Sequence, residues 1–79
     1  MSANLVGQRI RIARAMKIPP WNQQKLLVKL QVEGLDLSQS SLSKIENGGR
    51  YVTDIELRAI AKVLNVSILW LMGESDEMK

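Results

Sequence analysis

The residues from 38 to 46 combine side chains that could read DNA bases with side chains that would pack into a core. In a helix with about 100° between successive residues, Leu42 and Ile45 fall on one side. The other side is polar and carries Gln39, Ser40, Ser43 and Lys44. Glutamine suits adenine and lysine suits guanine, while serine is small enough to let the backbone approach the bases closely. An ordinary solvated surface would have the same composition, so this segment alone leaves both interpretations open.

Other kinds of chemistry find little support in the composition. The chain of 79 residues has no histidine and no cysteine, and it contains no glycine-rich phosphate loop. Its densest carboxylates, Glu74, Asp76 and Glu77, lie near the end of the sequence, where nothing indicates a pocket. We therefore expect no enzymatic activity, no cofactor and no metal site.

Charge is unevenly distributed along the chain. The net charge is +3, and six basic residues precede Glu33, which is the first acidic residue. A basic region followed by an acidic end suits a polyanionic partner, although a solvated surface with a disordered end would give the same pattern. No apolar run approaches the roughly 20 residues of a membrane span and no signal peptide precedes the domain, so a cytoplasmic location is expected.

The spacing of apolar residues predicts an all-α fold, because it follows the helical period and never alternates over the length of a strand. A first helix is expected over residues 4–17 and is ended by Pro19-Pro20. Each later helix begins at a polar N-cap that follows an apolar residue, which meets a leucine five positions further on. The later helices are expected at 22–32, 38–46, 53–64 and 67–72. This predicts a compact five-helix bundle over residues 1–73, followed by an acidic, disordered tail at 74–79.

Residues 38–48, with the sequence SQSSLSKIENG, resemble the Cro-like and phage-repressor-like (XRE-type) helix-turn-helix family. The family pattern is a serine or threonine cap, three polar residues, an aliphatic residue, a polar pair and then aliphatic-Glu-Asn-Gly. Residues 7–11, 22–23 and 57–67 are similar as well, so the resemblance covers nearly the whole chain. It implies a lambda-repressor-like domain of a bacterial or phage transcriptional regulator, with repression the expected effect. Helix 38–46 would enter the major groove of double-stranded DNA.

The resemblance also implies roles for individual residues. The base-reading positions are Gln39, Ser40, Ser43 and Lys44. The phosphate-binding positions are Asn22, Gln23, Asn47, Arg50 and Tyr51. Matched by position, Arg14 and Glu46 would form a structural ion pair that joins the first helix to the recognition helix.

Three points stay open in the sequence. Between Leu26 and Ser38 the chain is several residues longer than the family's usual turn, which affects the transfer of exact contacts. The nearly apolar helix at 67–72 either fills the core or forms a homodimer surface. The alternative to DNA binding is a protein-interaction module of the same fold, such as an antitoxin-like partner binder. The basic first helix, together with Gln23, Lys44 and Arg50 on one side, favours DNA.

Overall fold

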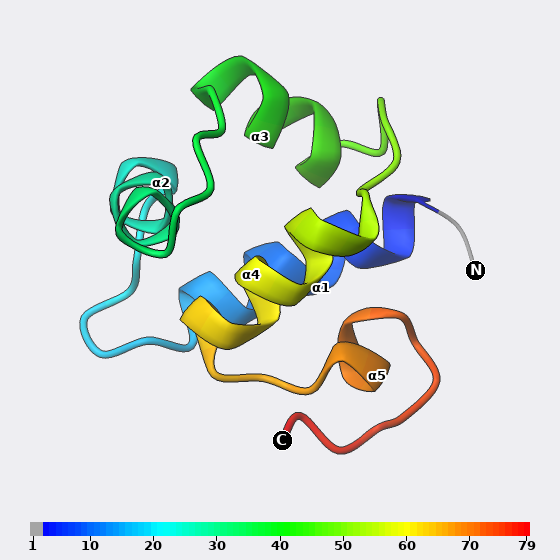
Figure 1. Ribbon diagram of the computed structural model, residues 1–79. Coiled ribbons are helices and arrows are strands. Elements are labelled where there is room, and N and C mark those ends of the chain that lie inside the picture. Colours follow the sequence, from blue (N-terminus) through cyan, green and yellow to red (C-terminus); the bar gives the residue numbers. More distant parts are fainter. Residues whose placement is uncertain (1–2) are drawn as a thin grey trace.

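A computed structural model describes residues 3–79, and every regular element within that range is an α-helix (Figure 1). The helices are α1 (Ala3–Ala15), α2 (Gln23–Val32), α3 (Gln39–Glu46), α4 (Asp54–Leu64) and α5 (Ile68–Leu71). The predicted all-α, five-helix fold is therefore confirmed. Residues 1 and 2, with which the expected domain begins, lie outside the described part. None of the described helices has the length and apolarity needed to cross a bilayer.

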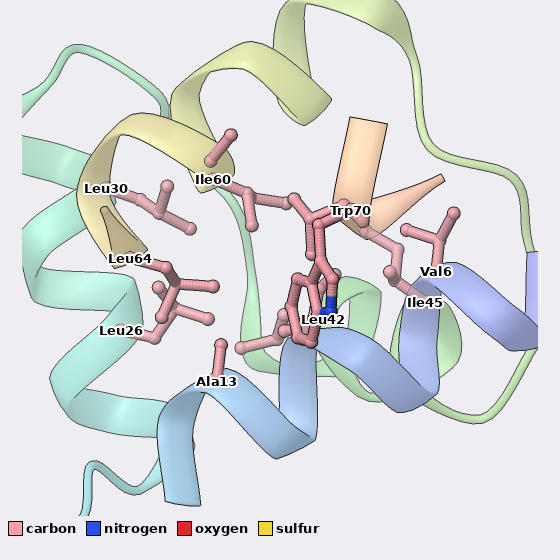
Figure 2. Close-up of a cluster of buried hydrophobic side chains, with 12 residues drawn as sticks. Val6, Ala13, Leu26, Leu30, Leu42, Ile45, Ile60, Leu64 and Trp70 are labelled. Atoms are coloured by element: carbon pink, nitrogen blue, oxygen red, sulfur yellow. The ribbon is translucent and has the colours of Figure 1, made fainter. Parts of the chain in front are cut away.

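The core takes side chains from all five helices, as Figure 2 shows for most of its members. Its buried apolar residues are Val6, Ile10, Ala13, Leu26, Leu30, Leu42, Ile45, Ile60, Ala61, Leu64, Trp70 and Leu71. The apolar residues that precede the four caps, Trp21, Leu37, Val52 and Val66, pack against this cluster. The apolar core holds α3 through Leu42 and Ile45, and Glu46 is buried on the same helix, so the outer side of α3 is left for other contacts.

Each of the four later helices starts directly after a polar cap. The side chains of Asn22, Ser38, Thr53 and Ser67 accept a hydrogen bond from the backbone N–H three residues further on. These bonds satisfy N–H groups that have no partner within the helix, and so they fix where each helix begins. The predicted ranges counted the cap as their first residue. Each of these four helices begins one residue after its cap, so the predicted starts agree with the structure. Two helices end earlier than predicted: α1 at Ala15 instead of residue 17, and α5 at Leu71 instead of residue 72.

The long connection between α2 and α3 is held to the core at several points. Gly34 has a φ of +93°, and its N–H donates to the carbonyl of Gln31 at 3.0 Å. Leu35 donates its N–H to the carbonyl of Leu30 at 2.9 Å, and its side chain packs against the core together with Leu37. The extra residues therefore form a fixed crossing from the far end of α2 to the start of α3 (Figure 1).

The acidic segment 74–79 differs from the expected disordered tail. The backbone N–H of Ser67 donates to the carbonyl of Met78 at 2.7 Å, and Met78 packs against the core. The Arg9 guanidinium donates to the carbonyl of Ser75 at 3.1 Å. The acidic residues suggested a solvated end. Instead, the Met78 side chain and the backbone carbonyls of Ser75 and Met78 hold the segment against the α4–α5 turn and α1. In Figure 1 the chain end lies beside that turn.

Candidate nucleic-acid interface

The four residues expected to read bases lie together on the outer side of α3. Gln39, Ser40 and Lys44 are exposed and Ser43 is half-buried, whereas Leu42 and Ile45 on the opposite side are completely buried. The helical spacing that separated these two groups in the sequence is therefore present in the structure. The result is a short helix with a polar outer surface, which is anchored by two aliphatic side chains.

The first turn of α2 lies beside the first turn of α3, and side-chain amides join them. Gln24 donates from Nε2 to Oε1 of Gln39 at 3.1 Å, and Gln39 donates from Nε2 to Oε1 of Gln23 at 3.3 Å. The Ser43 hydroxyl donates to the same Gln23 oxygen at 3.3 Å. These bonds hold Gln39 in place at the surface, where its amide could exchange one partner for a base edge.

Beneath this surface, Arg14 of α1 and Glu46 of α3 form a bidentate ion pair. Arg14 Nη2 lies 2.8 Å from Glu46 Oε1, and Nε donates to Oε2 at 2.9 Å. The side chains are only 14% and 3% exposed. Gln23 donates from Nε2 to Oε1 of Glu46 at 3.0 Å, and Arg14 also donates to the carbonyl of Trp21 at 2.8 Å. The carboxylate of Glu46 thus connects α1, α2 and α3.

The side chain of Gln23, which the resemblance places at a DNA phosphate, makes several contacts within the protein. Its amide nitrogen points inward to Glu46, and its amide oxygen accepts from Gln39 and Ser43. Sequence reasoning missed this because the three partners lie far from Gln23 along the chain. Asn22 caps α2 with its side chain and is exposed at the same helix end.

Gly7 permits a close contact between α1 and α3 that no residue with a side chain would allow. A Cβ atom at this position would meet the carbonyl oxygen of Ile45 and lie 2.7 Å from that of Glu46. The backbone at the C-terminal end of α3 therefore packs directly against α1. In the sequence, Gly7 was noted only as part of the family pattern, because helical glycine by itself does not reveal what lies against it.

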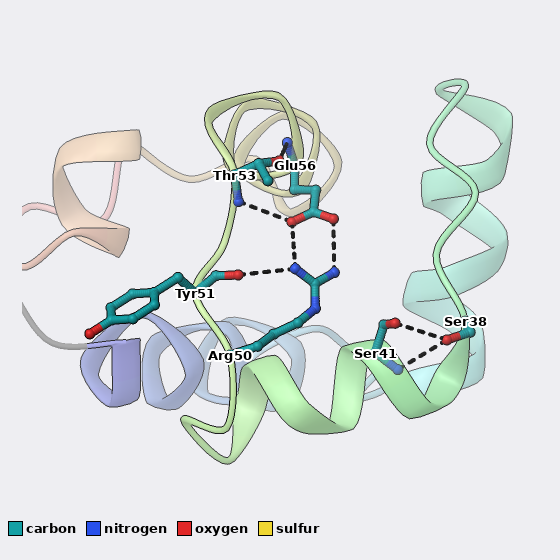
Figure 3. Close-up of polar contacts among 6 residues, drawn as sticks. All are labelled: Ser38, Ser41, Arg50, Tyr51, Thr53 and Glu56. Carbon is teal, nitrogen blue, oxygen red and sulfur yellow. Dashed lines mark hydrogen bonds and ion pairs between the residues drawn. The ribbon is translucent and has the colours of Figure 1, made fainter.

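Arg50 follows α3 in the loop that leads to α4, and its guanidinium faces α4 (Figure 3). It donates from Nη1 to Oε1 of Glu56 at 3.0 Å and from Nη2 to Oε2 at 2.8 Å, and also from Nη1 to the carbonyl of Tyr51 at 3.0 Å. The hydrogen bonds from Arg50 lower the pKa of the Glu56 carboxyl below its ordinary value of 4.5. The phosphate contact expected of Arg50 would therefore have to compete with this carboxylate.

Several of the basic residues near the start of the chain also have partners within the protein. Arg9 lies 5.0 Å from the centre of the Trp70 ring and donates to the Trp70 carbonyl at 2.6 Å. Lys17 donates to the carbonyl of Leu64 at 2.7 Å. With Arg14 bound to Glu46, three of the six early cations form hydrogen bonds within the protein, and a fourth, Lys29, lies 5.9 Å from the centre of the Trp21 ring. The exposed ones are Arg11, Lys25 and Lys29.

Comparison with known proteins gives one match. A family model described as helix-turn-helix matches residues 29–71, which is more than half of the chain. The match runs from the second half of α2 through α3 and α4 to the end of α5. No curated protein and no solved structure matches the chain.

Proposed function

The chain belongs to the XRE-type helix-turn-helix family, which binds DNA, and we propose that it is a sequence-specific transcriptional regulator. The observation that carries this proposal is the division of α3 into two sides. Leu42 and Ile45 fix the helix to the core, while Gln39 and Lys44 stand exposed on the opposite side. An α-helix fits the major groove of B-DNA, where base edges present distinct patterns of donors and acceptors.

In the proposed complex, α3 enters the major groove and the base-reading residues are Gln39, Ser40, Ser43 and Lys44. Gln39 would form paired hydrogen bonds with adenine and Lys44 would donate to guanine. Gln39 is held by Gln23 and Gln24 before DNA arrives, which supports a reading role because less side-chain freedom is then lost on binding.

The backbone of the DNA would be held from both ends of α3. At one end, the exposed start of α2 at Asn22 offers N–H groups and the positive end of the helix dipole to a phosphate. At the other end, Asn47 and Tyr51 are exposed in the loop after α3. Such contacts set the position of α3 on the duplex without selecting a sequence.

We also propose that the protein binds DNA as a homodimer through α5. Within this helix, Trp70 and Leu71 are buried, whereas Ile68 and Leu69 are 36% and 57% exposed. The helix therefore contributes to the core and still leaves apolar surface for a second copy. A two-fold dimer would read two half-sites, and its presence on a promoter would exclude other proteins, which makes repression in the cytoplasm the simplest outcome.

Selection of binding sites from random duplex DNA by the purified protein tests this proposal. A recurring motif of two inverted half-sites is the expected result, since the proposed dimer is symmetric. Recovered sequences with no common motif would contradict sequence-specific binding. No recovery at any salt concentration would favour the protein-interaction alternative instead.

A further inference from the structure

The loop of residues 47–53, between α3 and α4, is fixed at both of its ends. At the α3 end, the N–H of Gly49 donates to the carbonyl of Lys44 at 2.7 Å and that of Gly48 donates to Ile45 at 3.2 Å. At the α4 end, Glu56 accepts from the N–H of Thr53 at 3.0 Å. The loop therefore has little freedom where it joins each helix.

Arg50 links the middle of this loop to the α4 end. Its guanidinium binds both carboxylate oxygens of Glu56 and also the carbonyl oxygen of Tyr51, as Figure 3 shows. The same carboxylate thus caps α4 and holds Arg50. Tyr51 is 76% exposed, and in Figure 3 its ring points away from the guanidinium. The contacts fix the backbone of the loop while they leave the tyrosine side chain outside.

From this geometry we infer that Arg50 and Glu56 form a positioning clamp, which acts on DNA affinity by fixing the loop that carries Asn47 and Tyr51. The inference rests on the proposed function, and it replaces the direct phosphate contact that the sequence suggested for Arg50. Arg50 and Glu56 are positioning residues in this account, and Asn47 and Tyr51 are the groups that meet the DNA backbone.

The state of the guanidinium argues against a direct phosphate contact. The planar fork that would bind a phosphate is already engaged by a carboxylate, and the Arg50 side chain is only 30% exposed. Since the contact lowers the pKa of Glu56, the carboxylate stays ionised at neutral pH and offsets the positive charge of Arg50. Binding a phosphate would therefore require the breaking of charge-assisted hydrogen bonds that already exist.

Two conservative variants distinguish the clamp from a direct contact. Arg50→Lys keeps the positive charge but loses the planar fork, and Glu56→Gln removes the anion but keeps an oxygen that can accept from Thr53. If the pair is a clamp, both variants weaken DNA binding by about two- to fivefold, and the dependence of binding on salt keeps its slope. If Arg50 contacts phosphate, Arg50→Lys binds nearly as the wild type does and Glu56→Gln, which frees the guanidinium, binds more tightly.

A double-mutant cycle provides a readout that a general loss of stability would not change. Asn47→Ala is measured in the wild-type protein and in Glu56→Gln, on the selected duplex at one salt concentration. Tyr51→Phe is measured in the same two backgrounds. Because the clamp binds the Tyr51 carbonyl, whereas Asn47 is held at the end of α3 by its own backbone N–H, we expect Tyr51→Phe to cost less affinity when the clamp is already broken and Asn47→Ala to cost the same in both backgrounds. Arg58→Lys, an exposed change on α4, is the matched control and leaves affinity unchanged.

The outcomes separate this inference from the function on which it rests. Wild-type protein that binds no duplex would overturn the proposed function and the clamp together. Wild-type protein that binds, with tighter binding by Glu56→Gln or with strictly additive effects of Tyr51→Phe and Glu56→Gln, would overturn the clamp alone. Circular dichroism of each variant at the assay temperature verifies that it is folded when it is measured.

Discussion

The two Arg–Glu pairs within residues 3–79 have nearly the same geometry but lie in different surroundings. Arg14–Glu46 and Arg50–Glu56 are both bidentate, and each has a shortest ion-pair distance of 2.8 Å. The Glu46 side chain is 3% exposed and that of Glu56 is 13% exposed, while their arginines are 14% and 30% exposed. The first pair joins two helices that are distant in sequence. The second joins the loop after α3 to the first turn of α4.

This difference indicates that burial, more than bond geometry, determines what each pair does. Removing Arg14 would leave the nearly inaccessible Glu46 carboxylate without a partner, and removing Glu46 would leave Arg14 with little access to water, so either change is costly. Both members of the second pair are more exposed, so they are more easily hydrated when the pair opens and the pair contributes less to global stability. We conclude that Arg14–Glu46 maintains the architecture, whereas Arg50–Glu56 sets the position of one loop.

The largest effect is expected for Glu46→Ala. This change leaves the Arg14 guanidinium and the Gln23 amide without their shared acceptor, and it should reduce the free energy of unfolding by about 3–5 kcal/mol. Urea denaturation followed by circular dichroism measures the loss. The double variant Arg14→Met/Glu46→Leu is the control, because it removes both charges and should lose less. A Glu46→Ala protein as stable as the parent would contradict the structural importance of the buried pair.

A second large effect is expected where the same two helices touch without side chains. Gly7→Ala places a methyl group against the carbonyl oxygens of Ile45 and Glu46, so α1 and α3 must move apart. We expect a loss of about 1–3 kcal/mol in the free energy of unfolding, although alanine is intrinsically better than glycine in a helix. Gln8→Ala, at the exposed neighbouring position, serves as the control and should change stability little. Equal melting temperatures for the two variants would show that the helices are not in close contact here.

The smallest effect is expected for Glu56→Gln, and it should depend on pH. The pKa of Glu56 is lowered in the folded state by its hydrogen bonds with Arg50, so its stabilising contribution is present above about pH 4.5. It is lost as the pH falls through the lowered value. We expect Glu56→Gln to be less stable than the parent by at most about 1 kcal/mol at pH 7, and the difference should narrow as the pH falls below about 4.5. A difference that keeps the same size as the pH is lowered would mean that Glu56 stabilises the fold without its charge.

Local signals in the sequence were enough to predict the helices. Each cap at Asn22, Ser38, Thr53 and Ser67 is a short-range interaction between a side chain and a backbone N–H three residues away. The two sides of α3 follow directly from helical periodicity. For this reason, the helix starts and the outer position of Gln39 and Lys44 could be predicted from the amino-acid sequence alone.

The partners of Gln23 and Arg50 could not be predicted in the same way. The family resemblance placed both side chains at phosphates, whereas in the structure each binds a glutamate that the folded chain brings near. The contacts of Met78 and Ser75 were missed for a similar reason, since the acidic residues around them dominate the local composition. Long-range side-chain contacts depend on tertiary packing, which local patterns do not report.

The most direct test of the DNA-reading account compares two classes of variant on two duplexes. Gln39→Ala and Lys44→Ala change the outer side of α3, whereas Asn47→Ala and Tyr51→Phe change the loop proposed to hold the backbone. Affinities are measured at one salt concentration on the selected duplex and on a scrambled duplex of equal length. We expect the first class to lose about 1–3 kcal/mol on the selected duplex and little on the scrambled one, and the second class to lose similar amounts on both. If both classes lost affinity equally on the two duplexes, α3 would not be the element that reads the bases.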